Sequence, residues 1–343
     1  MKILVCPDSY KGTMSATEAA RAMENGVRTS LPDAEVVSLP VGDGGEGTAE
    51  AVSAAMAGNE EVRLIESPAL DALERQIMAA YRIIGNRIAV IESAAASGLT
   101  LIPAGERDIM RAGTKGTGML IADAYRRGVR DFIICMGGTA SCDGGAGADE
   151  VLRELDLADS RFTLLCDVEN PLCGPSGAAA VFGPQKGATP EMIPVLEQRL
   201  AQTAADYERR SGIDVRDMKY AGAAGGLSAM LMALYGAKPV SGIEKVLELL
   251  DFNSRLEGAD LVITGEGCAD ATTLNGKAAK GILDAARARG VPVAIIGGRV
   301  PDRQMLLDAG FRFVAEATPR NPDPSVTPRQ YLTMAVSDIL NNL

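Results

Sequence analysis

Histidine is absent from the 343 residues of this chain. Without an imidazole, the Ser-His-Asp and Cys-His nucleophile mechanisms, phosphohistidine intermediates and histidine-based metal sites are all excluded. Any proton transfer must therefore fall to Asp, Glu, Lys, Tyr or Cys side chains. Phosphoryl transfer fits this constraint, because it depends mainly on positioning and on charge stabilisation.

Long apolar runs, an excess of basic charge and paired cysteines are missing too. No stretch approaches the roughly 18 apolar residues of a membrane span, and the apolar start of the chain meets Pro7 and Asp8 too soon for a signal peptide. The net charge of −11 argues against nucleic acid or an anionic membrane as a partner. The six cysteines form no C-x-x-C pair and show no usual zinc spacing. We therefore expect a cytoplasmic protein with reduced cysteines.

The length and the pattern of segments predict an α/β protein. At 343 residues the chain exceeds the size at which a single core usually stops growing, so two domains are expected. Strand-like and helix-like segments alternate over most of the length, which is typical of a largely parallel sheet. The stretch 62–91 instead has three short β-like segments, which suggest a more antiparallel unit. Ser15 and Glu18 have the spacing of a capping box at a helix start. Further helices are expected over 48–58, 192–210 and 278–289.

Four apolar, strand-like runs end in segments rich in glycine and acid. They are Ile3–Cys6 before Asp8-Ser9-Tyr10-Lys11, Val36–Val41 before Gly42-Asp43-Gly44-Gly45-Glu46-Gly47, Phe132–Met136 before Gly137–Gly145, and Leu261–Thr264 before Gly265-Glu266-Gly267 with Asp270 behind. In open α/β sheets, ligands bind at the carboxyl ends of the strands. Glycine lets backbone N–H groups approach an anion, and carboxylates suit Mg²⁺, which is usually held by one or two acids plus substrate phosphates. The four segments together therefore predict a site for phosphate chemistry.

Each motif also has a plainer interpretation, which the spacing alone leaves open. Asp8 and Ser9 could satisfy local backbone groups in a polar loop. The segment 114–118, which contains Thr117, is equally well a routine helix start, and close backbone packing explains Gly222–Gly226 as well as ligand contact does. For the remaining motifs the alternatives are a tight acidic turn at 42–47, a long connecting loop at 137–145, a surface turn presenting Lys186, and a simple turn at 265–267.

Taken in order, these and further segments resemble one family, the bacterial glycerate kinases that phosphorylate D-glycerate with ATP, commonly at the 2-hydroxyl. The matching segments span nearly the whole chain. They are Pro7–Lys11, Asp43–Thr48, Ala94–Leu99, Gly116–Gly118, Asp143–Gly147, Cys166–Val168 with Asn170–Leu172, Phe182–Ala188, Gly222–Gly226, Ser241–Glu244 and Thr264–Gly267. The resemblance implies two α/β domains, one of them Rossmann-like with a largely parallel sheet, and an active site in the cleft between them. We place the Rossmann-like domain coarsely at 1–60 and 245–343, and the second domain at 61–244.

The resemblance, together with the chemistry of the loops, assigns roles to individual residues. ATP and Mg²⁺ are the implied cofactors and D-glycerate the implied substrate. Asp143 and Asp167 are the candidates for accepting the hydroxyl proton, and Lys11 and Lys186 would neutralise phosphate or the glycerate carboxylate. The acids expected to bind the metal ion are Asp43, Glu266 and Asp270. The expected substrate or nucleotide contacts are Asp8, Ser9, Gly44, Gly45, Thr117, Gly138, Thr139, Gly144 and Gly225.

Two departures from the family pattern leave alternatives open. Ala148–Thr163 is a short bridge where the family usually has a few dozen more residues, so part of the second domain's sheet is missing or rebuilt. Cys268 stands where arginine commonly follows the Gly-Glu-Gly motif, and its loss would remove a bidentate contact to carboxylate or phosphate. A kinase of another small hydroxy acid, or a catalytically impaired sensor of glycerate or nucleotide, therefore stays open. The sequence does not set the oligomeric state, for which a homodimer is one candidate.

Overall fold

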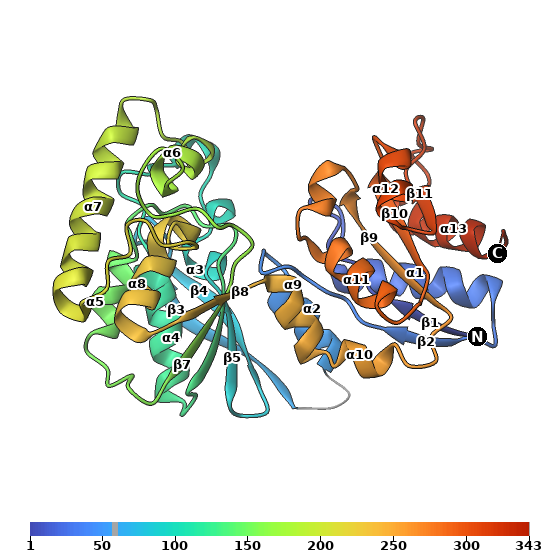
Figure 1. The fold of residues 1–343 in the computed structure, drawn as a ribbon, viewed down its shortest axis with the longest axis horizontal. Coiled ribbons are helices and arrows are strands. Elements are labelled where there is room, and N and C mark those ends of the chain that lie inside the picture. The colour runs from blue at the N-terminus through green and yellow to red at the C-terminus, as the bar shows by residue number, and fades with distance from the viewer. Residues whose placement is uncertain (57–60, 343) are drawn as a thin grey trace. The chain divides into compact units, whose positions relative to one another are not determined.

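The computed structural model describes residues 1–56 and 61–342, and these form two compact units (Figure 1). The first unit comprises Met1–Asp43, Glu50–Gly58 and Gly242–Leu343, and the second comprises Gly44–Ala49 and Asn59–Ser241. Each unit has its own sheet, so the predicted fold class of two α/β domains, one of them with a largely parallel sheet, is confirmed. The domain ranges expected from the sequence stay a prediction.

The sheet of the first unit is parallel throughout, with the strand order β11-β10-β9-β1-β2. Its strands are β1 (Lys2–Val5), β2 (Glu35–Ser38), β9 (Leu261–Cys268), β10 (Val293–Arg299) and β11 (Phe313–Glu316). From β1 the chain builds outward to β2 on one side, and from β9 it builds outward to β11 on the other. The junction of β1 and β9 is therefore the point where the strand order reverses, which in doubly wound sheets is where ligands bind.

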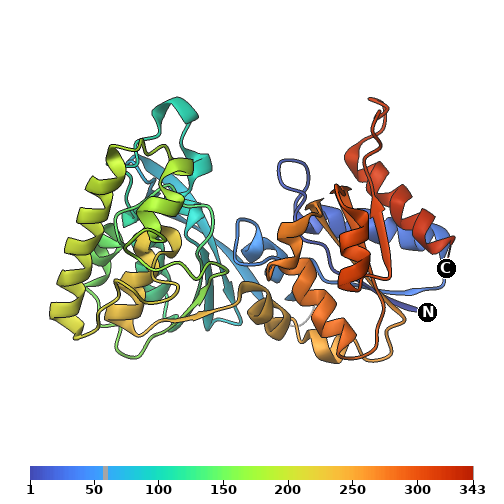
Figure 2. The ribbon, with the colours of Figure 1, turned by 45° about the horizontal axis from the view of Figure 1, so that its top comes forward.

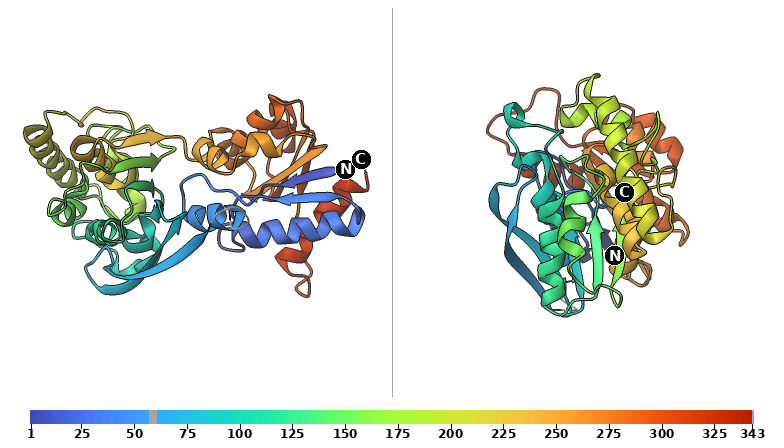
Figure 3. Two further views of the ribbon diagram at one scale, coloured as in Figure 1. Left: turned by 90° about the horizontal axis from the view of Figure 1, so that it is seen from below. Right: turned by 90° about the vertical axis from the view of Figure 1, so that its left-hand side faces the viewer.

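Helices cover both faces of this sheet. The helices of the first unit are α1 (Ala16–Ser30), α9 (Gly242–Leu249), α10 (Phe252–Arg255), α11 (Ala278–Arg287), α12 (Arg303–Ala309) and α13 (Pro328–Leu340), together with most of α2 (Thr48–Met56). Figure 3 shows α1 and α13 together on one face of the sheet and α9 and α11 on the other. The predicted start of α1 is confirmed, because Ser15 and Glu18 cap each other's backbone N–H groups.

The second unit has a mixed sheet with the strand order β3-β4-β5-β6-β7-β8. Strands β3 (Val62–Leu70), β4 (Gln76–Ile84) and β5 (Ile88–Glu92) pair antiparallel, as the sequence predicts for this stretch. Strands β6 (Asp131–Cys135), β7 (Arg161–Leu165) and β8 (Lys238–Val240) continue the sheet in parallel with β5. The short bridge 148–163 thus comprises most of α5, the connection 153–160 and the start of β7, and β7 pairs directly with β6.

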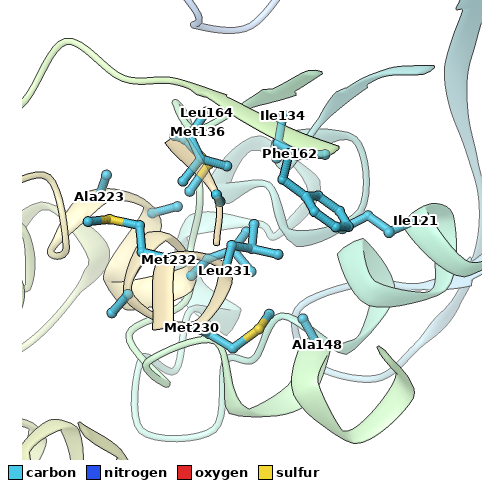
Figure 4. Close-up of a cluster of buried hydrophobic side chains, with 14 of the residues drawn as sticks. Ile121, Ile134, Met136, Ala148, Phe162, Leu164, Ala223, Met230, Leu231 and Met232 are labelled. Atoms are coloured by element: carbon cyan, nitrogen blue, oxygen red, sulfur yellow. The ribbon is translucent and has the colours of Figure 1, made fainter. Parts of the chain in front are cut away.

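The helices of the second unit enclose an alanine- and leucine-rich core. They are α3 (Ala94–Ser97), α4 (Lys115–Arg126), α5 (Ala146–Leu152), α6 (Ala178–Phe182), α7 (Met192–Ser211) and α8 (Leu227–Tyr235). Figure 2 shows the long helix α7 running along the side of this unit. Figure 4 shows Leu231 of α8 facing side chains from β6 and β7, among them Ile134 and Phe162, while Met230 of the same helix points toward Ala148 of α5. This packing fixes the loops that leave the carboxyl ends of β6 and β7.

Among the four apolar runs that end in glycine and acid, two strand ends differ from the structure by more than one residue. Strand β2 ends at Ser38 instead of Val41. Strand β9 does not end at Thr264 but continues to Cys268, so Gly265, Glu266 and Cys268 pair with β10 and the Gly-Glu-Gly segment does not form a loop. The expected helix end at Gly58 lies outside the described residues. Within the described parts of the chain, no helix combines the length and apolar character needed to cross a membrane.

Candidate functional site

A cavity of about 440 Å³ lies in the first unit at the carboxyl ends of β1 and β9, where the strand order reverses. Its charged lining residues are Asp8, Lys11, Asp43, Glu266, Asp270, Lys277 and Arg299, and Ser9 and Tyr10 also contribute. The predicted positions Asp8, Ser9, Lys11, Asp43, Glu266 and Asp270 are thus brought together around one space. Acids and cations in one concave site suit an anionic ligand that is bound together with a cation.

The loop after β1 is fixed against β9 and β10 by hydrogen bonds. The backbone N–H of Asp8 donates to the carbonyl of Gly265 at 2.9 Å, and the Tyr10 hydroxyl donates to the carbonyl of Ile296 at 2.6 Å. A Cβ atom at Gly265 would lie 2.3 Å from the Tyr10 hydroxyl oxygen, so a side chain there would displace Tyr10. Gly265 therefore serves close packing inside the sheet, which holds Asp8 in the loop after β1 close to Glu266 on β9.

The acids of the cavity have perturbed protonation equilibria. Burial, with the nearby negative charge of Asp43 as the next cause, raises the pKa of Asp8 to about 7. Burial also raises the pKa of Glu266, and the Thr273 hydroxyl partly offsets that effect. Oε1 of Glu266 is buried and has no hydrogen-bond partner in the structure. Because an unpaired buried carboxylate is costly, this oxygen fits a cation or a ligand hydroxyl.

The acids of the cavity supply part of the ligand shell that Mg²⁺ needs. Among the residues that the structure describes, no three Asp, Glu or Cys side chains are arranged to hold a metal ion. Mg²⁺ commonly takes only one or two carboxylates and completes its shell with phosphates and water, so Asp43 and Glu266 would suffice. Asp270 has a local role, because its Oδ1 accepts hydrogen bonds from the N–H and the hydroxyl of Thr272 at 2.8 and 2.7 Å.

In the second unit, Asp143 is committed to the backbone around it. Its carboxylate accepts the N–H of Gly145 at 3.1 Å and of Gly147 at 3.1 Å. It also accepts both the N–H and the hydroxyl of Thr114, at 2.9 and 2.8 Å. The side chain thus ties the start of α4 to the start of α5. The other predicted proton acceptor, Asp167, is exposed just after β7.

Lys186 is buried, so a surface turn is the wrong interpretation of its motif. The side chain is 5% exposed, and its Nζ donates to Thr139 Oγ1 at 3.1 Å and to the carbonyl of Ser141 at 2.7 Å. Burial lowers the pKa of Lys186 to about 8. The lysine thus contacts Thr139 and the backbone of Ser141, and these hydrogen bonds hold the loop that follows β6.

Most of the predicted glycine contacts have packing reasons. A Cβ at Gly225 would lie 2.0 Å from the carbonyl oxygen of Ser141, and a Cβ at Gly44 would lie 2.9 Å from Cβ of Leu165. A Cβ at Gly137 would lie 2.9 Å from Cα of Gly45, and a Cβ at Gly144 3.0 Å from the Thr203 side chain. Thr117 is fully buried and hydrogen-bonds to Ser93 and Ser97. The exposed Gly138 is the most accessible of the predicted glycines in this loop.

Sequence reasoning missed Glu92, which fills the backbone amide nest at the start of α2. Oε1 of Glu92 accepts the N–H of Gly47 at 3.1 Å and of Ala49 at 2.8 Å, and Thr48 Oγ1 accepts the N–H of Gly44 at 3.1 Å. The amides that the sequence assigns to phosphate are thus occupied by the protein's own groups. The only available signal was an acid at the end of strand β5. Lys277 and Arg299 were missed as well, because neither lies in a glycine-rich motif.

Comparison with known proteins identifies the family. The model of the glycerate kinase family matches residues 3–154 and 149–333. The chain is 41% identical to a glycerate kinase of Bacillus subtilis (93% of this chain, 92% of the relative) and 40% identical to the glycerate 2-kinase of Escherichia coli (88% and 86%). A crystal structure from Salmonella typhimurium LT2, of a protein assigned as glycerate kinase 2, superposes with a TM-score of 0.87 at 36% identity, over 100% of this chain and 98% of that one. The chain therefore belongs to the glycerate kinase family and is a kinase, an enzyme that transfers a phosphoryl group to an alcohol acceptor.

Proposed function

We propose that this enzyme transfers the γ-phosphoryl group of ATP to the 2-hydroxyl of D-glycerate in the presence of Mg²⁺. The observation that carries the proposal is the cavity at the junction of β1 and β9, where Asp8, Asp43 and Glu266 lie with Lys11 and further cations. The 40% identity to a relative named glycerate 2-kinase supports the choice of hydroxyl. The proposal includes a cytoplasmic location and D-glycerate and ATP as small-molecule partners, with neither nucleic acid nor a membrane as a partner.

Asp43 and Glu266 are the residues that would hold Mg²⁺. The buried, unpartnered Oε1 of Glu266 is the feature that fits the ion best. When bound, the ion would neutralise charge on the phosphoryl group in transfer. Asp270 is the weaker of the three expected metal acids, because its Oδ1 already accepts two hydrogen bonds from Thr272.

We assign acceptance of the substrate hydroxyl proton to Asp8 in preference to Asp143. A general base works best when its pKa lies near the working pH, and the pKa of Asp8 is raised to about 7. Asp143 has no free capacity for this role, since its carboxylate accepts four hydrogen bonds from its own chain. Asp167, exposed at the end of β7, is the alternative.

Two lysines and the glycine loops complete the proposed site. Lys11, exposed in the loop after β1, is placed to neutralise a phosphate. Lys186 acts by holding Thr139 and the loop 137–145, in which Gly138 is exposed to a ligand. Ser9, Gly44, Gly45, Thr117, Gly144 and Gly225 then act by shaping the loops and by backbone contacts.

A coupled assay with ATP, Mg²⁺ and D-glycerate tests the proposal, with NMR of the product to separate 2-phosphoglycerate from 3-phosphoglycerate. We expect turnover that needs Mg²⁺ and gives the 2-phosphate. Turnover with a different hydroxy acid only would favour the first alternative, an altered substrate. Tight binding of D-glycerate without turnover would favour the second, a sensor, and would refute the enzymatic proposal for glycerate.

A further inference from the structure

We propose that Arg299 binds the carboxylate of the acceptor substrate and so makes the enzyme select a hydroxy acid over a neutral alcohol. This inference rests on the proposed function and names the group that recognises the acid end of the substrate. Arg299 ends strand β10 and lines the cavity together with Cys268 of the neighbouring strand β9. It is the only arginine among the lining residues in the described chain.

The register of the sheet places Arg299 directly beside Cys268. The two residues are Cα partners in the parallel pairing of β9 with β10, so their Cα atoms lie about 4.8 Å apart and their side chains leave the same face of the sheet. The N–H of Ala269 donates to the carbonyl of Arg299 at 2.9 Å, which fixes both strand ends. The side chain of Cys268 is short, so the space beside it is left to the longer arginine.

The guanidinium of Arg299 is available to a ligand. Its one ion pair among the described residues is with Oε1 of Glu316, at 4.0 Å, and the arginine side chain is 57% exposed. The other oxygen of Glu316 accepts the N–H of Val300 at 2.7 Å. Exposed ion pairs at such a separation contribute little. No hydrogen bond from the guanidinium to a described residue is present, so its N–H donors remain for a carboxylate, which the planar guanidinium matches in a bidentate manner.

The lysines of the cavity are less suited to this task. Nζ of Lys277 donates to Thr272 Oγ1 at 2.7 Å and is partly committed. Lys11 lies in an exposed loop, and an ammonium group is a point charge that binds phosphate without the planar geometry of a carboxylate. Arg299 also accounts for the cysteine at position 268. The guanidinium missing from β9 is supplied from the adjacent position of β10, so Cys268 need not impair the enzyme.

Steady-state kinetics of Arg299→Lys and Arg299→Met test this assignment. For Arg299→Met we expect the KM for D-glycerate to rise about 10- to 100-fold, as for the loss of a charge-assisted hydrogen-bonded pair, while the KM for ATP stays within about twofold. The KM of Arg299→Lys for D-glycerate should lie between those of the wild type and of Arg299→Met. The preference for D-glycerate over its neutral amide should fall by the same factor, a change that a purely structural role would not cause. Arg303→Met, an exposed arginine at the start of α12, is the matched control and should leave both KM values unchanged.

The double variant Arg299→Met with Cys268→Arg adds a rescue. Because the two positions are register neighbours, an arginine at 268 should restore at least a tenfold part of the lost affinity for D-glycerate. An unchanged KM for D-glycerate in Arg299→Met, or a larger effect on the KM for ATP, would overturn the inference. Calorimetric measurement of D-glycerate binding in the absence of ATP separates failure of the Arg299 inference from failure of the proposed function. If the wild-type protein binds D-glycerate but does not turn it over, the enzymatic proposal fails. If Arg299→Met binds D-glycerate as tightly as the wild type does, the proposed role of Arg299 fails.

Discussion

Replacing Asp143 by Asn should lower the stability of the second unit and should affect catalysis less. The carboxylate accepts four hydrogen bonds, two from Thr114 and one each from Gly145 and Gly147. The single amide oxygen of Asn can accept two of them, and its NH₂ group would face donors instead. With about 1–3 kcal/mol for each buried group left unsatisfied, we expect a loss of about 3 kcal/mol. For a unit of roughly 190 residues this corresponds to a Tm lowered by about 6–12 °C.

Thermal unfolding followed by calorimetry measures this change, with kcat measured on the same preparations below the transition. Asp217→Asn is the matched control, because Asp217 is an exposed acid of the same unit. Its Tm should stay within about 1–2 °C of the wild-type value, since exposed substitutions usually change stability by less than about 0.5 kcal/mol. The reasoning would be refuted by an Asp143→Asn variant with an unchanged Tm and a kcat reduced 100-fold or more, because Asp143 would then act on the substrate.

Three further substitutions probe the cavity and the packing. Asp8→Asn should raise Tm at pH 8 but not near pH 4, because the raised pKa of Asp8 makes its ionisation cost stability as the pH rises from about 4 to about 7; equal shifts at both pH values in a Tm-against-pH series would contradict this. Glu266→Gln should raise the Mg²⁺ concentration for half-maximal activity about tenfold or more, without lowering Tm, since it removes a buried charge whose Oε1 has no hydrogen-bond partner; an unchanged Mg²⁺ titration would exclude Glu266 from the metal site. Gly225→Ala should cost about 2–5 kcal/mol in urea unfolding, because its Cβ would lie 2.0 Å from the Ser141 carbonyl oxygen at a φ of +64°; wild-type stability would show that this backbone yields freely.

The fold could be predicted wherever a local pattern sets the structure. The capping box at Ser15 and the antiparallel stretch 62–91 are examples, because each depends on neighbours in sequence. The end of β9 could not be predicted, because glycine and acid usually mark a turn. Here Gly265 stays in the strand for a tertiary reason, namely the Tyr10 hydroxyl that crosses over it.

The candidate site was predictable in its residue types more than in their roles. The acids at the ends of β1 and β9 do line one cavity, as loops at strand ends suggest. The sequence could not predict, however, which of these side chains are buried or which groups they hydrogen-bond to. A lysine in a Pro- and Gly-rich motif reads as exposed, yet Lys186 is enclosed by the loop after β6. Arg299 lies outside every motif, and only the register of β9 with β10 brings it to the cavity.

The division of the chain between the two units has a consequence for how this protein is made. During synthesis β1 and β2 emerge first, but their sheet lacks β9, β10 and β11 until residues beyond 241 have been translated. The second unit, mostly the continuous stretch Asn59–Ser241, is complete much earlier and can fold as a unit on the ribosome. The first unit must then close its sheet around an already folded insertion, which is a long-range and slow step. No single cut yields both units intact, so an isolated first unit would require the second to be replaced by a short linker.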